Sequence, residues 1–372
     1  MRYLRGTWMR GGTSKCWIFD DEAVASVIPA GGDVGTLLVA AFGAGDPRQL
    51  DGVGGATSTT SKAAIVRRSA VPGIDVDYDF AQVGIGARRV EWGSNCGNCA
   101  TAIGLYALLT GLVPVTPGRT TVRMRNTNTG SVLAATVDTP GAAVPESGTA
   151  RVPGAVGGGV GVELAFLDPA GGTTGSLLPT GHPVDTLPAP ATLVDAGAPA
   201  ALIDAAALGL TGGEPVEDLT RAVPELVRLR REAALRMGLA TPGSPVDHAV
   251  PKTGVVGPPA GYVTTDGTPV GPGEFDLAVR MLSMLAPHPA IGLTSAVAVA
   301  AAAGVPGGVV SRLLGGRVPT VLRLGTPAGV VAVGTEWDPD GVLRGVRLRR
   351  AARRIAVAEI SVPEPARVPE PA

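Results

Sequence analysis

Two segments of the chain consist of small and apolar residues that would cover every side of a helix. They constrain the fold more than any other feature. Residues 98–110 read NCATAIGLYALLT, and residues 294–303 read TSAVAVAAAA. A helix without a polar face belongs in the interior of a protein. Gly follows each segment directly, as Gly111 and Gly304, and Pro comes soon after, which is typical of a helix end. We therefore expect one buried helix in each half of the chain.

Gly and Pro divide most of the remaining sequence into short apolar pieces. The 54 glycines and 33 prolines are spread along the whole chain, and frequent turn signals of this kind are typical of a strand-rich fold. Residues 140–159, rich in Gly, Pro and Ala, are predicted to form a loop. Period-two patterns predict strands at residues 121–125, 131–137, 160–167, 320–324, 330–334 and 343–348.

Two amphipathic helices are predicted on the outside of the fold. Residues 224–237 begin with Pro and are followed by Gly238, which suits the start and the end of a helix. A second apolar stripe at helical spacing is formed by Phe275, Ala278, Met281, Leu282 and Leu285.

The length of 372 residues favours two domains, because single hydrophobic cores seldom grow to that size. We place the boundary after the turn cluster at residues 178–181. This gives a domain of residues 1–185 and a domain of residues 186–372, whose last strands can return to the first domain. A cleft between two domains is the expected place for a ligand.

Composition excludes several classes of partner. Lys and Arg number 31 against 32 Asp and Glu, and aromatic residues make up 3% of the chain, so neither charge nor stacking surface favours nucleic acid. No apolar run reaches the length of a signal peptide or a membrane span. We therefore expect no membrane association and a cytoplasmic location. A homo-oligomer is compatible with the sequence but not indicated by it.

The cysteines and histidines give little support for a metal site. Cys16, Cys96 and Cys99 suit a reducing compartment, and the CxxC spacing of the last two has no second pair. HxH and HExxH spacings are absent from the sequence, whose histidines are His182, His248 and His288. We expect neither a metal nor any other cofactor.

Three loops of similar composition combine Gly with polar side chains. They are residues 9–15 (MRGGTSK), 54–62 (GGATSTTSK) and 93–98 (GSNCGN). Gly lets backbone N–H groups approach a ligand, and the neighbouring donors can bind an anion. We predict that these loops hold substrate carboxylates, with a tight turn as the alternative for any one of them. No GxxxxGK[ST] or strand-anchored GxGxxG pattern indicates a nucleotide.

Lys62 and Cys96 are the candidates for proton transfer. Cys96 precedes the first buried helix, whose N-terminus would stabilise a thiolate; an inert core residue is the alternative. Lys62 is followed by the apolar residues 63–66, and partial desolvation would favour the neutral amine of a general base; a solvated lysine is the alternative. Cys99 is interpreted as packing, and Lys15 as a residue that could hold substrate charge.

In the second half of the chain, the segment with Thr294 and Ser295 lies at the start of the buried helix and corresponds in position to the Cys96 loop. Hydroxyl groups are poor bases at neutral pH, so we expect them to donate hydrogen bonds to a carboxylate at a helix start. His288 lies between two prolines and is interpreted as structural or solvated, with an assisting role left open. A solvated strand face is the interpretation for Arg347, Arg349, Arg350, Arg353 and Arg354.

Several motifs, in order along nearly the whole chain, resemble the PrpF-like proteins. That family includes 2-methylaconitate cis-trans isomerase, methylitaconate isomerase and 4-oxalomesaconate tautomerase. The resemblance rests on MRGGTSK (9–15), DGVGGATSTTSK (51–62), SNCGNC (94–99), LLPTG (177–181), LVDAGAP (193–199), LGLTG (208–212), HPAIGLTSA (288–296) and RRAARRIA (349–356).

The resemblance implies a diaminopimelate-epimerase-like fold of the α+β class. In such a fold two pseudo-symmetric domains each wrap a mainly antiparallel sheet around a central buried helix, and the active site lies between them. The resemblance also implies proton transfer by Lys62 and Cys96. Cys16 is a departure, because such proteins usually carry Gly there, and we expect the pocket wall to differ. The loops and the resemblance together predict substrate contacts from Arg10, Gly12, Thr13, Ser14, Ser58, Thr59, Asn95, Gly97, Asn98, Thr294 and Ser295.

The resulting hypothesis is a cofactor-independent isomerase of a small unsaturated di- or tricarboxylic acid such as 2-methylaconitate. Lys62 would remove an allylic proton while helix-start N–H groups stabilise a dienolate-like intermediate. Return of the proton after bond rotation gives cis-trans isomerisation, and its return two carbons away gives double-bond migration. The alternatives are a non-catalytic tricarboxylate-binding accessory protein of a dehydratase and a cysteine-dependent epimerase, which would require a second facing base.

Overall fold

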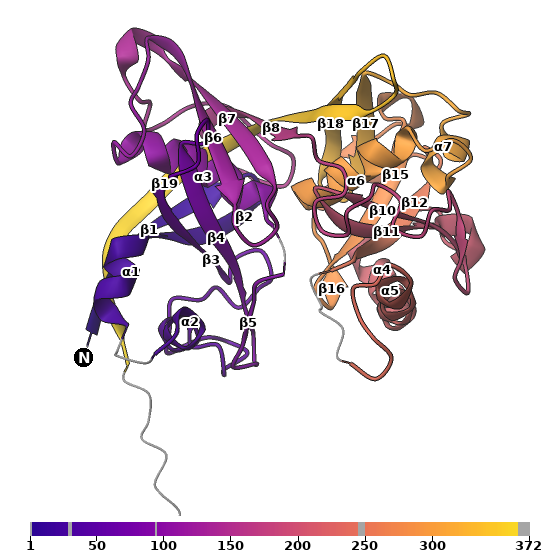
Figure 1. Cartoon of the computed structure of the whole chain (residues 1–372). Helices are drawn as coiled ribbons and strands as arrows, with labels where there is room; N and C mark the ends of the chain where they lie inside the picture. The colour runs from indigo at the N-terminus through magenta and orange to yellow at the C-terminus, as the bar shows by residue number, and fades with distance from the viewer. Residues whose placement is uncertain (1, 29–31, 94, 245–249, 364–372) are drawn as a thin grey trace, which may run out of the picture.

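The computed structural model describes residues 2–28, 32–93, 95–244 and 250–363. Ser94 of the third loop and His248 lie outside the described residues. The chain is arranged around two helices, α3 (Gly97–Leu109) and α6 (Leu293–Ala303), each with strands packed about it (Figure 1). All of α6, and all of α3 except its last residue, is buried. The two predicted buried helices are therefore confirmed.

The strands around α3 close into a ring. Each strand pairs with the next in the order given below, and the last pairs with the first. The β2–β3 and β4–β6 pairs are parallel and the others antiparallel. A closed ring leaves no free strand edge along these pairs. Its members are β1 (Arg2–Gly11), β2 (Ser14–Asp20), β3 (Lys62–Arg68), β4 (Val76–Val83), β6 (Gly118–Asn126), β7 (Val132–Thr139), β8 (Val160–Leu167) and β19 (Leu343–Val362).

A second series of paired strands packs around α6. Its parallel pairs are β11–β12 and β15–β17, and its other pairs are antiparallel. The series ends on β19, which therefore pairs with strands of both groups and runs from β18 towards β1 (Figure 1). Its members are β10 (Pro190–Ala196), β11 (Ala198–Asp204), β12 (Lys252–Gly257), β15 (Leu277–Ser283), β17 (Val321–Thr326), β18 (Gly329–Trp337) and the start of β19.

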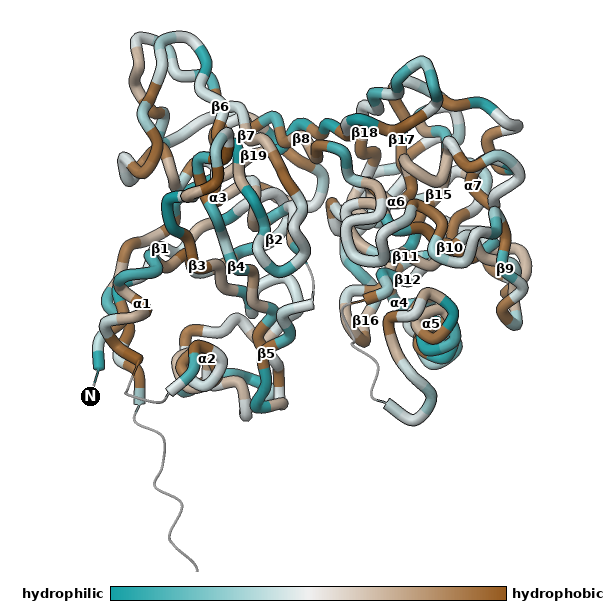
Figure 2. Tube along the Cα trace, in the orientation of Figure 1, coloured by the Kyte–Doolittle hydropathy of each residue, from teal (hydrophilic) through white to brown (hydrophobic). Residues whose placement is uncertain are grey.

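The remaining helices and short strands lie around these two groups. The outer helix predicted near residues 224–237 is confirmed as α5 (Val223–Arg236), which buries Leu226, Leu229 and Ala233 and carries a hydrophilic face (Figure 2). No helix in the described ranges is long and apolar enough to cross a membrane. The other elements are α1 (Asp21–Val27), α2 (Val34–Phe42), α4 (Val216–Leu219), α7 (Val309–Leu313), β5 (Val90–Glu91), β9 (Asp185–Thr186), β13 (Tyr262–Val263), β14 (Pro269–Val270) and β16 (Ala286–Pro287).

The strand predictions are confirmed within β6, β7, β8, β17, β18 and β19, but one helix prediction was wrong. The stripe from Phe275 to Leu285 contains strand β15, not a helix. The residues of β15 are buried in succession from Leu277 to Leu282, because Val279 and Met281 on one face pack in the main core while Leu282 on the other face packs with α5. A strand covered on both faces loses its alternation, so a short apolar run there can match helical spacing. Residues 140–159 lie outside the strands, as predicted for a loop.

Arg350 is a second correction. The basic run was predicted to be solvated, and Arg347, Arg349 and Arg353 are exposed, but Arg350 is only 4% exposed. Alternation along β19 turns Arg350 inward, beside its cross-strand neighbour Val162 in the core. Burial without a nearby negative charge lowers the pKa of Arg350 to about 10. The arginine is therefore part of the interior and not of the solvated face.

The close packing of α3 against β7 gives a test of this core. A Cβ at Gly104 would overlap the Cβ of Ala135. We expect Gly104→Val to lower the free energy of unfolding by about 1–3 kcal/mol, because overpacking forces the helix and strand apart. Urea unfolding would measure the change, with Gly157→Val in an open part of the loop as the control. Equal unfolding midpoints for the two variants would contradict this packing.

Candidate active site

A small cavity lies where the starts of α3 and α6 meet. Its volume is about 50 Å³, and its walls come from both groups of strands. The residues that line it are Ser14, Thr59, Lys62, Phe80, Gln82, Asn95, Cys96, Gly97, Asn98, Lys252, Leu282, Ser283, Met284, His288, Gly292, Leu293, Thr294 and Ser295.

Both buried helices direct their N-termini at this cavity. Cys96 and Gly292 are the N-cap residues, and neither helix start has a side-chain cap hydrogen bond. Gly97 allows the helix starts to meet, because a Cβ there would lie 2.7 Å from the Cβ of Leu293. Unsatisfied N–H groups and the positive ends of two helix dipoles therefore face the same small space, which favours an anion.

The cavity wall carries two lysines. Lys62 begins β3 and is 7% exposed, and Lys252 begins β12 and is half-buried. The Lys62 Nζ donates a hydrogen bond to Gln82 Oε1 at 2.5 Å and lies 5.1 Å from the ring centroid of Phe80. In the described part of the chain, no Asp or Glu lines the cavity. The site is thus positive, and it matches a ligand that carries carboxylates.

Gln82 is held in place by a network below the cavity. Its Nε2 donates to the backbone oxygen of Ser61 at 3.0 Å. The Ser61 hydroxyl accepts from Gln49 Nε2 at 2.8 Å, and Gln49 Oε1 accepts from the backbone N–H of Ala56 at 2.8 Å. The network therefore fixes the direction of Gln82 Oε1. Because this oxygen accepts a hydrogen bond from the Lys62 ammonium, it holds that ammonium at the cavity wall.

Two buried amides at the cavity each have an atom without a partner among the described residues. Asn95 Oδ1 accepts from the Tyr78 hydroxyl at 2.8 Å, while its Nδ2 has no partner. Asn98 Nδ2 donates to Thr13 Oγ1 at 3.2 Å, while its Oδ1 has none. A buried polar atom without a hydrogen bond is costly. A carboxylate oxygen is the matching acceptor for the Nδ2 of Asn95.

The Cys96 thiol is held protonated. A hydrogen bond with the Cys99 thiol, together with burial, raises the pKa of Cys96 well above its ordinary value, although the Lys62 ammonium acts in the opposite direction. This differs from the prediction of a stabilised thiolate, because desolvation and the second thiol outweigh the helix N-terminus. The arrangement makes Cys96 a proton donor instead of a ready base.

The other two cysteines belong to the core. Cys99 is fully buried, in line with its interpretation as packing, and burial also raises its pKa. Cys16 is fully buried and close enough to hydrogen-bond with Cys99. Cys16 does not line the cavity, so its side chain does not change the wall directly, contrary to expectation.

Most of the predicted site residues meet at the cavity, but four do not line it. Arg10 donates to the backbone oxygens of Gly158 at 2.9 Å and of Gly12 at 3.2 Å. Gly12 has a φ of 51°, and a Cβ there would overlap Asn98 Oδ1. Arg10, Gly12 and Thr13 therefore shape the loop behind Asn98. Ser58 is half-buried in the neighbouring loop. The cavity is lined, as predicted, by Lys62, Cys96, Ser14, Thr59, Asn95, Gly97, Asn98, Thr294 and Ser295.

Sequence analysis missed several lining residues. His288 was interpreted as structural or solvated, yet it is 6% exposed and faces the cavity. Lys252 left one usable signal: it precedes a short apolar strand, as Lys62 does. No motif pointed to the remaining ones, which are Phe80, Gln82, Leu282, Ser283 and Met284.

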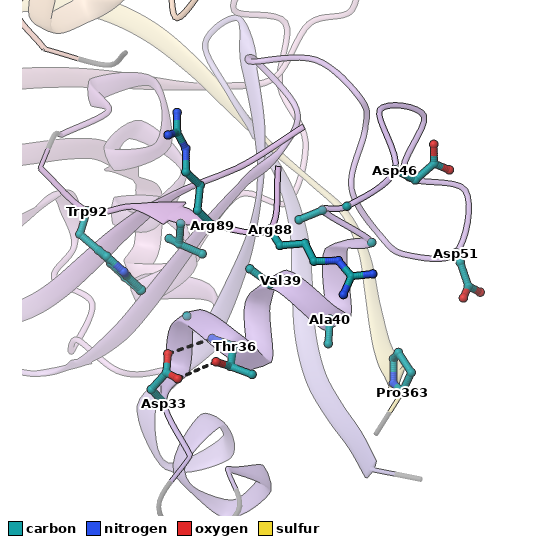
Figure 3. Close-up of a pocket in the computed structure, with 15 residues that line it drawn as sticks. Asp33, Thr36, Val39, Ala40, Asp46, Asp51, Arg88, Arg89, Trp92 and Pro363 are labelled. Atoms are coloured by element: carbon teal, nitrogen blue, oxygen red, sulfur yellow. Dashed lines mark hydrogen bonds between the residues drawn. The ribbon is translucent and has the colours of Figure 1, made fainter. Parts of the chain in front are cut away.

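A larger groove lies elsewhere, beside α2 (Figure 3). Its volume is about 980 Å³, and its lining includes Asp46, Asp51, Arg88 and Arg89. Charged side chains of both signs line it, and none of the predicted site residues does. No cluster of three or more His, Cys, Asp or Glu suited to a metal occurs among the described residues. The chemistry therefore points to the smaller cavity.

Comparison with known proteins identifies the family. Residues 1–363 match the family described as PrpF protein. The chain belongs to the PrpF family. It is 36% identical to 2-methyl-aconitate isomerase of Shewanella oneidensis, with 97% of each chain covered. It is also 36% identical to (4E)-oxalomesaconate Delta-isomerase of a Novosphingobium species, with 94% of each covered.

Solved structures agree with membership of the PrpF family. A methylitaconate-delta-isomerase structure matches with a TM-score of 0.78 and 31% identity, over 96% of this chain and 95% of the other. A hydroxyproline epimerase matches with a TM-score of 0.55 and 12% identity, over 98% and 94%, which bears on the fold alone. The protein therefore has the strand-rich α+β fold of the epimerase-like proteins.

The raised pKa of Cys96 can be tested with two variants that should change the rate of Cys96 alkylation in opposite directions. We expect alkylation of Cys96 by iodoacetamide to be slow at pH 7 and to rise only above pH ~9, the ordinary range of a thiol. Cys99→Ala should speed the reaction, because it removes the thiol that raises the pKa. Lys62→Met should slow it, because it removes the favourable positive charge. Mass spectrometry of the Cys96 peptide across pH would measure the rates. Rapid alkylation of wild type at pH 7 would refute the protonated thiol.

Proposed function

We propose that this PrpF protein moves a proton along a small unsaturated di- or tricarboxylic acid, with Lys62 and Cys96 as the proton-transfer residues and no cofactor. The protein is an isomerase of a small acid, as its relatives are named. The observation that carries the mechanism is the cavity itself. Two uncapped helix starts and two lysines face it, without a carboxylate among the described lining residues.

Substrate carboxylates would bind at the two helix starts. The first N–H groups of α3 and α6 would receive one carboxylate each, and the hydroxyls of Thr294 and Ser295 would add donors at the second. Asn95 Nδ2, which lacks a partner among the described residues, would donate to the first. Negative charge that develops on a bound carboxylate would be stabilised by donors already in place, which lowers the barrier.

The proposed reaction is a proton shift through a dienolate-like intermediate. Once the Lys62 ammonium has lost a proton to solvent, its amine takes an allylic proton, and the electron pair of the broken C–H bond delocalises through the double bond into the conjugated carboxylate. If the Cys96 thiol protonates the far carbon, the double bond migrates, and the Lys62 ammonium then returns a proton to the thiolate. If Lys62 returns the proton to the original carbon after rotation, the product is the cis-trans isomer.

We also propose the pseudo-symmetric arrangement in two domains, residues 1–185 and 186–372, with β19 returning to the first. The order of antiparallel and parallel pairs is the same from β1 to β8 as from β10 to β19. Lys62 and Lys252 begin corresponding strands. A cavity of about 50 Å³ holds little more than a water or two, so the domains would separate for the substrate to enter.

The two alternatives are less well supported. An epimerase would need a base facing Cys96, but the corresponding helix start offers the hydroxyls of Thr294 and Ser295. A non-catalytic accessory protein is not favoured, because the relatives are named isomerases. A polycarboxylate is the proposed partner. The absence of a nucleic-acid partner, the cytoplasmic location and a homo-oligomer stay predictions.

The central test is isomerisation in D2O by wild type and Lys62→Ala. The acids offered would be 2-methylaconitate, methylitaconate and 4-oxalomesaconate, followed by proton NMR. We expect one acid to be isomerised and Lys62→Ala to be slower by roughly 10²–10⁴-fold, the usual contribution of a general base. Lys15→Ala is the matched control, because Lys15 lies 5.2 Å from the ring centroid of Trp8 and does not line the cavity.

The position of deuterium separates the two outcomes of the reaction. Deuterium two carbons from the original C–H would indicate double-bond migration, and exchange at the original carbon would indicate cis-trans isomerisation. A Lys62→Ala variant as active as wild type would remove Lys62 from the mechanism. If no acid changed or exchanged, the proposal would fail for these substrates.

Lys252 provides a second test. We expect Lys252→Ala to raise KM by roughly 10–100-fold, the equivalent of one charge-assisted hydrogen bond, with a smaller change in kcat. A binding residue acts on the ground state and the transition state alike, whereas Lys62 acts on the chemical step. Steady-state kinetics would separate the two. An unchanged KM would show that Lys252 does not bind the substrate.

A further inference from the structure

We propose that His288 is a neutral hydrogen-bond donor that holds a substrate carboxylate through its Nε2–H, a role that rests on the function proposed above. It would stabilise the charge that builds up on this carboxylate when the allylic proton leaves. The residue would bind and polarise the substrate without carrying a proton to or from it.

The contacts of His288 fix its tautomer. Its Nδ1 accepts a hydrogen bond from the backbone N–H of Ala290 at 2.9 Å. An Nδ1 that accepts cannot carry a hydrogen, so the single ring N–H of the neutral imidazole is on Nε2. No described residue hydrogen-bonds to that Nε2, and the side chain lines the cavity. The free donor therefore belongs to the ligand site.

The backbone holds the ring in one place. The N–H of His288 donates to the backbone oxygen of Met281 at 2.8 Å, which ties the residue to β15. Pro287 and Pro289 flank it, and a proline both fixes its own φ and restricts the residue before it. A donor that is already oriented costs little reorganisation when negative charge develops.

The surroundings keep the ring neutral. His288 is 6% exposed. Burial, with the positive charges of Lys62 on β3, Lys252 on β12 and Arg350 on β19, lowers the pKa of His288 to about 3. The other titratable group on the cavity wall is the Cys96 thiol, whose pKa is raised. Near neutral pH the ring therefore carries only its Nε2 hydrogen and not the second proton of an imidazolium, and it does not compete with Lys62 as an acid or base.

Arg350 also favours the neutral ring, although less than burial, Lys62 and Lys252 do. It is buried on β19, and its Nε has no hydrogen-bond partner among the described residues. A second buried cation beside it would be repelled. A neutral donor supplies a hydrogen bond to the carboxylate without adding another positive charge, as neutral imidazoles do in other enzymes that polarise a substrate oxygen.

Kinetics of two variants test the donor. Gln places an N–H group near the position of the histidine Nε2, whereas Leu has similar bulk and no donor. On the acid that wild type isomerises, we expect His288→Leu to lower kcat/KM by roughly 10²–10³-fold, as loss of one such donor does. His288→Gln should stay within about tenfold of wild type. His182→Leu, at an exposed histidine, is the control and should leave kcat/KM unchanged.

Nitrogen NMR of the wild-type protein supplies a measurement that needs no activity. With 15N-labelled histidine, and His288→Gln to assign the signal, we expect the Nε2–H tautomer of His288 at every pH from 5 to 9. A second N–H on the ring, or a titration near the ordinary histidine pKa, would overturn the proposal. So would a His288→Leu variant with wild-type kcat/KM while Lys62→Ala is inactive. Failure of the proposed function itself would instead appear as a wild-type protein that isomerises none of the acids.

Discussion

The meeting of two uncapped helix starts at one point is the constraint on which the rest of the structure depends. Because α3 and α6 have no polar face, each requires apolar strands on all its sides. Packing the two sets of strands together brings Gly97 against Leu293, where only a residue without a side chain allows the approach. The junction leaves a group of buried N–H donors without cap side chains. An anionic ligand can accept hydrogen bonds from them.

The side chains around the junction add positive charge. Lys62 and Lys252 face the cavity, the buried Arg350 acts on His288, and the described wall has no carboxylate to balance them. Burial and these positive charges keep His288 neutral. Cys96 keeps its proton for a different reason, because the hydrogen bond with Cys99 and burial outweigh the effect of Lys62. A polycarboxylate would supply the missing negative charge. Proton transfer by Lys62 and Cys96 is our proposal for how such a ligand would then react.

Much of the candidate site was predictable because it lies in local sequence patterns. Loops that combine Gly with small polar residues led to Ser14 and Thr59, which lie at strand starts, and to Asn98, which lies at a helix start. Lys62 was detectable because an apolar strand follows it. Gln82 was missed because it carries no local motif and reaches the cavity through strand pairing. Lys252 has an apolar strand after it, as Lys62 does, but no loop of Gly and small polar residues directly before it. The pKa direction of Cys96 was mistaken because it depends on the second thiol and on burial, which the helix-start pattern does not report.

The sequence by itself determined the two buried helices, six of the strands, and the loops that carry Lys62 and Cys96. These features follow from the composition and spacing of residues that lie close together in the sequence. Only the tertiary structure decided that β15 is a strand, that Arg350 points inward and that His288 faces the cavity. The physical reason is that burial depends on which distant segments cover a residue, and this covering sets both strand periodicity and the state of a titratable group.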